Sequence, residues 1–169
     1  QVEHALSNIA VSASDTVRSR INTQLATLAE LAEQPILQEL SDESLSYLDL
    51  ATQRLGYLDL GWVNAEGIAH YPADNTADLG NRSYIIKAFE NQTNMSEVII
   101  SRVVNKPVIM LATPIRDKSS QAVKGVLIAR MDASLLSDIT DDLGFGKGGF
   151  AFVVNAEGIF IANRDREKV

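Results

Sequence analysis

The residues best suited to chemistry lie in one short segment, Asp78-Leu79-Gly80-Asn81-Arg82-Ser83-Tyr84. Arg82 and Tyr84 stand two residues apart, where a polar loop is expected to meet a short helix that faces a sheet. A guanidinium can bind a carboxylate through two parallel hydrogen bonds, and a neighbouring ring can cover it. The segment therefore indicates a carboxylate site. The alternative is that Arg82 only pairs with a local acid such as Asp78.

Asp132 is a second candidate, because it follows a predicted strand and could hold a cation. The alternative is that its carboxylate only caps the helix predicted after it.

No catalytic or metal-binding motif is recognisable elsewhere. The chain has no Cys, which excludes disulfides, thiolate metal sites and a cysteine nucleophile. His4 and His70 lie far apart, and the Gly-rich stretch 144–149 lacks the order of a phosphate loop. The acids of 74–78 lack the spacing of an EF-hand. We therefore expect no enzyme, no metal site and no cofactor; turnover in a hydrolase panel would point to the enzyme alternative.

The composition is that of one compact core with a short part of a second. The chain has 169 residues, of which 46% are hydrophobic, and a net charge of −7. This acidic balance argues against nucleic acid or an anionic membrane surface as a partner. No apolar run reaches the roughly 18 residues of a membrane span, and the first residue is Gln1. We expect a module excised from a longer protein.

Two helices are predicted ahead of the sheet. Apolar residues recur at steps of three and four over residues 2–33, and Pro35 marks the stop. A helix of this length would measure about 45 Å, so it either packs along the core or forms a stalk that pairs with its twin. A second helix is predicted at 42–55, with Ser41 as its N-cap.

The remaining pattern predicts an antiparallel sheet flanked by helices, the α+β class. Gly67 is expected to supply a positive φ in a turn at 64–67. Asn105 and Lys106 are expected to form another turn, between two of the later strands. The predicted elements are strands at 57–63 and 68–71, a polar loop at 72–81, a short helix at 82–90, strands at 96–104, 107–115 and 125–131, and a helix at 132–142.

The chain then repeats part of itself. Val63-Asn64-Ala65-Glu66-Gly67-Ile68 recurs residue for residue as Val154-Asn155-Ala156-Glu157-Gly158-Ile159. We interpret residues 1–35 as a stalk helix, 36–142 as a ligand-binding module, and 143–169 as the truncated start of a second module. The second copy of the turn, at 155–158, is then expected to close a hairpin.

Four segments resemble the double-Cache type of extracytoplasmic sensor domain, and the resemblance covers nearly the whole chain. Residues 78–89 are similar to the family pattern d-x-s-x-R-x-Y/W-f-x-x-A, and residues 112–117 to a-x-P-v-x-d. Residues 125–135 are similar to G-v-l-x-x-x-i-D-l-s-x-L, and 148–163 resemble the entry into the membrane-proximal module. The long N-terminal helix fits the same family.

This resemblance implies a PAS-like antiparallel sheet. It also implies a homodimeric receptor whose two subunits run parallel and contact each other through the N-terminal helix. The region would lie outside the cytoplasmic membrane, in the periplasm or the extracellular space, between two membrane-spanning helices absent from this sequence. The output inside the cell would be chemotaxis signalling, a histidine kinase or a diguanylate cyclase.

The resemblance also implies roles for individual residues. In family members that bind amino acids, an Arg and an aromatic residue hold the carboxylate, and Arg82 and Tyr84 match them; Asp132 matches the Asp that holds the ammonium. Ile85 departs from a second aromatic residue. Ile99 and Ser101 stand where those members carry Tyr and Asp, and Ser101 is kept as a candidate contact.

The expected ligand is a carboxylate-bearing metabolite such as an amino acid or an organic acid. The alternative is a structural or protein-binding module without a small-molecule ligand.

Overall fold

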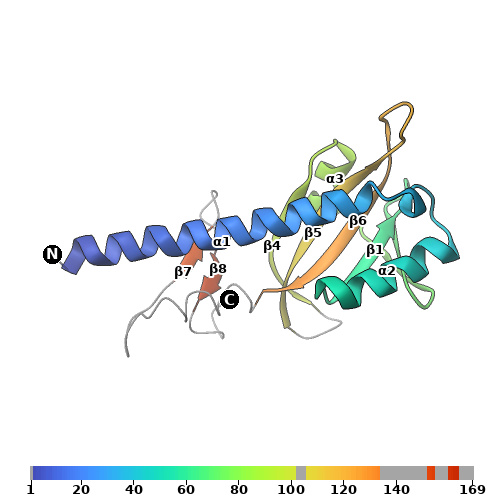
Figure 1. The fold of residues 1–169 in the computed structure, drawn as a ribbon. Helices are drawn as coiled ribbons and strands as arrows, with labels where there is room; N and C mark the ends of the chain where they lie inside the picture. Colours follow the sequence, from blue (N-terminus) through green and yellow to red (C-terminus); the bar gives the residue numbers. More distant parts are fainter. Residues whose placement is uncertain (1, 102–105, 134–151, 155–159, 164–169) are drawn as a thin grey trace. The chain divides into compact units, whose positions relative to one another are not determined.

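The computed structural model describes residues 2–101, 106–133, 152–154 and 160–163 (Figure 1). The chain divides into two compact units. Residues 24–96 and 109–131 form the first, which we call the sheet unit, and residues 1–23, 97–108 and 132–169 form the second unit.

Both predicted N-terminal helices are confirmed. Helix α1 (Val2–Ala32) ends two residues before Gln34, whose ψ of 134° is extended, and a short 3-10 helix η1 (Pro35–Leu37) follows. Helix α2 (Asp42–Leu55) begins at Ser41, whose hydroxyl accepts a hydrogen bond from the Ser44 N–H at 3.1 Å. It ends at Gly56, which has a φ of +74° and so makes the left-handed cap that glycine favours.

Six strands form one antiparallel sheet and confirm the α+β class. Their order is β3-β2-β1-β6-β5-β4. Helix α3 (Ser83–Phe89) lies between β3 and β4 in the chain. The strands are β1 (Asp59–Val63), β2 (Ile68–Tyr71), β3 (Asn75–Asp78), β4 (Asn94–Ser101), β5 (Lys106–Arg116) and β6 (Val123–Asp132).

The predicted polar loop at 72–81 is wrong in its middle, because residues 75–78 form β3 and pair antiparallel with β2. The three residues 72–74 connect the two strands, and Ala73 and Asp74 have φ values of 62° and 58°, so this tight turn adopts left-handed conformations without the usual glycine. Strand β3 lies at the sheet edge and is mostly exposed. It therefore lacks the apolar alternation by which a half-buried strand is recognised. The predicted turn at 105–106 is also wrong at Lys106, which begins β5.

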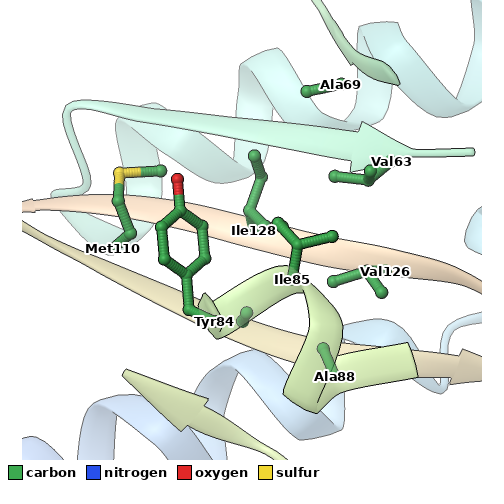
Figure 2. Packing of buried hydrophobic residues seen from close by; sticks show 9 residues of the cluster. Val63, Ala69, Tyr84, Ile85, Ala88, Met110, Val126 and Ile128 are labelled. Atoms are coloured by element: carbon green, nitrogen blue, oxygen red, sulfur yellow. The ribbon is translucent and has the colours of Figure 1, made fainter. Parts of the chain in front are cut away.

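The two faces of the sheet unit bury different residues. On one face, the Trp62 indole N–H donates to the Leu37 carbonyl oxygen at 2.9 Å, and Gly125 leaves room for the ring. On the other face, α3 covers strands β1, β2, β5 and β6 through an apolar cluster (Figure 2). Its buried members are Val63, Ala69, Tyr84, Ile85, Ala88, Met110, Ala112, Val126 and Ile128. We call this second face the α3 face.

Strands β7 (Phe152–Val154) and β8 (Phe160–Asn163) pair antiparallel in a separate two-stranded sheet. This pairing is what a hairpin around the repeated turn requires, but the turn at 155–158 lies outside the described residues. So does the helix predicted to run on to residue 142. The division of the chain into a stalk and two modules stays a prediction.

Candidate functional site

Arg82 occupies the residue just before α3, and its backbone is extended with a φ of −79° and a ψ of 134°. Its N–H donates to the Leu79 carbonyl oxygen at 2.9 Å, which fixes the backbone ahead of the helix. The side chain is exposed, and no ion pair among the described residues includes it. Asp78 is the acid that the sequence offers as an alternative partner for Arg82. Its carboxylate instead accepts a hydrogen bond from the Gly80 N–H at 3.2 Å. As far as the described ranges go, the guanidinium therefore has its donors available.

The segment before Arg82 is held in place by the turn between β1 and β2. The Leu79 N–H donates to the Gly67 carbonyl oxygen at 2.9 Å. Gly67 has a φ of +82°, and a Cβ built on it would lie 2.3 Å from the Gly80 Cα. The two backbones approach so closely that a side chain on Gly67 would force them apart. This glycine contact positions the loop that carries Arg82.

Tyr84 lies in the first turn of α3 and is 7% exposed. The Asn94 side-chain amide donates to its carbonyl oxygen at 3.1 Å, which fastens the helix start to β4. Burial raises the pKa of the Tyr84 hydroxyl, and the charges of Arg82 and Arg130 oppose that rise. Figure 2 shows the ring beside Met110, with its hydroxyl directed away from α3. The hydroxyl therefore keeps its proton and can donate a hydrogen bond. It also lies within the electric fields of Arg82 and Arg130.

A polar cluster that sequence reasoning missed lies on the α3 face. Asp59 of β1 stands opposite Arg130 of β6, and their side chains form an ion pair at 2.6 Å. The Arg130 guanidinium carbon lies 6.0 Å from the centre of the Tyr71 ring. A Cβ on Gly61 would lie 2.8 Å from Tyr71 Cε1, so the missing side chain is what lets this ring lie across β1.

The groups of this cluster perturb one another. Burial raises the pKa of the Asp59 carboxyl. The Arg130 charge lowers this pKa, but by less than burial raises it. Burial, followed by the Asp59 charge, raises the pKa of Tyr71 to about 12, and Tyr84 adds to this rise. Asp59 Oδ1 is buried without a hydrogen-bond partner. The signal in the sequence was a charged residue inside each of two apolar strands, at Asp59 and Arg130.

Of the four residues predicted to bind the ligand, Arg82 and Tyr84 belong to the sheet unit and stand two positions apart at the start of α3. Asp132 is the last residue of β6, and its carboxylate lies 3.7 Å from the Lys106 ammonium. Ser101 is the last residue of β4. Both belong to the second unit, so their part in the site stays a prediction.

Among the described residues, no group of three or more His, Asp or Glu side chains is placed to hold a metal ion. Within the same ranges, no helix is both long and apolar enough to span a membrane.

A family model of the double-Cache type, described as Cache domain, matches residues 1–169. A comparison with curated protein sequences gave no match.

Solved structures share the fold at low sequence identity. The ligand-binding domain of the Pseudomonas aeruginosa PAO1 amino acid chemoreceptor PctB, in complex with L-Arg, is 19% identical with a TM-score of 0.79, over 99% of this chain and 73% of that one. The ligand-binding domain of the Pseudomonas fluorescens chemoreceptor CtaA, in complex with L-serine, is 16% identical with a TM-score of 0.79, over 99% and 74%. The sensory domain of the Campylobacter jejuni chemoreceptor Tlp3, with isoleucine bound, is 14% identical with a TM-score of 0.72, over 99% and 74%.

Proposed function

The chain belongs to the Cache domain family, and from that membership we propose that it is the extracytoplasmic ligand-sensing part of a transmembrane signal-transduction receptor. Its ligand is a small metabolite that bears a carboxylate, such as an amino acid or an organic acid. Three solved structures of the same fold are chemoreceptor domains, with arginine, serine or isoleucine bound. Cache sensory domains bind ligands without catalysis, and we propose the same of this chain.

One observation carries the choice of a carboxylate. Arg82 is exposed and forms no ion pair with the other described residues, and the protonated hydroxyl of Tyr84, two residues further on, feels its charge. A free guanidinium presents a planar fork of donors that fits the two oxygens of a carboxylate. The Tyr84 hydroxyl adds one more donor. Together these groups favour an anionic head group of that shape.

We test this proposal by isothermal titration calorimetry of the chain with the proteinogenic L-amino acids and a set of small mono- and dicarboxylates. We expect at least one of them to bind, and Arg82→Ala to weaken that binding by about 10-fold or more, which is about 1.4 kcal/mol. This is less than the roughly 2–5 kcal/mol of a buried charge pair, because Arg82 is exposed before the ligand covers it. Arg82→Lys should restore only part of the loss, because an ammonium replaces the fork.

Arg54→Ala is the matched control, because it removes the same charge from an exposed position on α2. It should leave the affinity unchanged. If Arg82→Ala binds as tightly as the unmodified chain, Arg82 is not the carboxylate anchor. If no carboxylate binds at all, the alternative of a structural or protein-binding module is favoured.

A further inference from the structure

We propose that Arg116 couples the candidate ligand site to α1, because its side chain links the end of α3 to the end of α1. This inference rests on the proposed function and names how that site would regulate the receptor. Arg116 is the last residue of β5 and is half-buried. Its Nε donates a hydrogen bond to Asn91 Oδ1 at 2.7 Å, and its Nη1 lies 3.6 Å from Glu33 Oε1. All three residues belong to the sheet unit.

Asn91 closes the C-terminal end of α3. Its N–H donates to the Ala88 carbonyl oxygen and the Gln92 N–H donates to the Lys87 carbonyl oxygen, both at 3.0 Å, which is the Schellman pattern. Asn91 has a φ of 68°, in the left-handed region where glycine is the usual residue of this pattern. An asparagine is less favourable there than a glycine, but it has a side chain, and that side chain contacts Arg116.

Helix α3 joins this contact to the candidate ligand site. Arg82 lies just before the helix, Asn91 lies just after its cap, and the helix between them spans seven residues. Ile85 and Ala88 are fully buried in the cluster that packs α3 on the sheet. Because a close-packed element transmits strain, a ligand that draws Arg82 toward itself would shift this short helix as one body. The shift would then reach Asn91 at the other end.

Glu33 directly follows the last residue of α1 and is still bonded to that helix. Its N–H donates to the Glu30 carbonyl oxygen at 3.3 Å. The sheet unit contains α1 from residue 24 onward, and the earlier residues of the helix belong to the second unit. Since α1 is one continuous helix across this division, a change at its end can be carried out of the sheet unit.

The guanidinium joins its two contacts through one rigid plane. Nε and Nη1 belong to the same planar group, so a rotation that follows Asn91 also moves the nitrogen that faces Glu33. The Glu33 side chain is 58% exposed, and exposed ion pairs contribute little to stability. Substitutions in this link should therefore leave the chain folded and change the coupling.

The first measurement needs no ligand. Amide hydrogen exchange, followed by NMR on the 169-residue chain, reports how often the last turn of α1 opens at residues 30–34. We expect Asn91→Gly to speed exchange there by about 2-fold or more, because Arg116 is then held less firmly against Glu33. Glycine should keep α3 capped. In an Arg116→Gln background, Asn91→Gly should have no further effect on these amides.

The second measurement adds a ligand, the tightest-binding compound of the calorimetric screen of L-amino acids and small mono- and dicarboxylates. At saturation it should slow exchange at residues 30–34 of the unmodified chain by about 2-fold or more, and Arg116→Gln should abolish this change. Because coupling is reciprocal, the Kd of Arg116→Gln should stay within about 3-fold of that of the unmodified chain. Arg54→Gln removes an exposed guanidinium from α2 and, as the matched control, should keep the ligand response.

Exchange in the last turn of α1 that does not respond to Asn91→Gly overturns the inference and leaves the proposed function standing. So does a ligand response that persists in Arg116→Gln, or a ligand that binds without changing these amides. If no compound of the screen binds, the proposed function fails and the coupling assigned to Arg116 fails with it.

Discussion

Tyr57 precedes β1 in the sheet unit, where it is 6% exposed and donates its hydroxyl to the Gln24 carbonyl oxygen at 3.3 Å. Burial raises the pKa of this tyrosine to about 12, above its ordinary value of 10.0. Below pH 10 the hydroxyl is protonated in both the folded and the unfolded chain, so this group's contribution to stability is fully present there. Above pH 10 the unfolded chain loses the proton first, and the contribution falls as the pH rises toward 12.

We therefore predict that the free energy of unfolding falls between pH 10 and 12, and that Tyr57→Phe reduces the slope by about 1.4 kcal/mol per pH unit. At pH 8 the same variant should lose about 1 kcal/mol with its hydrogen bond. Urea unfolding followed by circular dichroism measures both quantities. An unchanged slope in Tyr57→Phe would show that this tyrosine does not hold its proton as described.

At the scale of elements, the turn between β1 and β2 sets the position of the loop before α3. Gly67 and Gly56 both have positive φ, at +82° and +74°. They differ in their surroundings: a Cβ at Gly67 would meet the Gly80 backbone, while a Cβ at Gly56 would meet nothing within 4 Å. The two glycines therefore separate the cost of the backbone conformation from the cost of the contact.

We predict that Gly56→Ala costs about 1 kcal/mol of unfolding free energy, because alanine adopts the left-handed conformation poorly. Gly67→Ala should cost about 2–4 kcal/mol, because overpacking against Gly80 adds to the same conformational cost. It should also weaken ligand binding, since the displaced loop carries Arg82, whereas Gly56→Ala should not. Thermal unfolding and calorimetry of both variants measure this difference. Equal effects of the two variants would mean that the glycine contact does not position the loop.

For the whole molecule, we propose that the receptor is a homodimer whose subunits run parallel and meet along α1. Ile9 and Ala13 are one turn apart on this helix, and Val11 lies half a turn away from them. The chain has no cysteine, so an introduced one is unique within these 169 residues. In the membrane-bound receptor we predict that Ile9→Cys and Ala13→Cys form intersubunit disulfides on mild oxidation, and that Val11→Cys forms few.

The native membrane is needed for this measurement, because the membrane spans that we propose on either side of this chain would raise the local concentration of the helices. Cross-linking that is absent at all three positions, or equally strong at all three, would contradict a helix pair with a defined face. A defined pair would give the receptor a two-state element that ligand binding can shift.

The sequence alone determined the features that depend on local chemistry. The apolar spacing of α1, the Ser41 cap of α2 and the positive φ of Gly67 are each set by residues within a few positions, and the structure has all three. Arg82 and Tyr84 were found in the same way, because two residues of one short segment stay neighbours in any fold. The α+β class followed from the order of these local patterns.

The tertiary structure alone decided which distant strands lie side by side. Strand β6 pairs with β1, and this pairing is what sets Arg130 opposite Asp59. Strand β3 joins the sheet although its residues are polar, because an edge strand has backbone partners on one side and needs no buried face of its own. Periodicity reports which side of a strand is buried but not which strand lies beside it. The pair Arg82 and Tyr84, whose role at a carboxylate site stays a prediction, could therefore be picked out from the sequence, and the polar cluster across β1 and β6 could not.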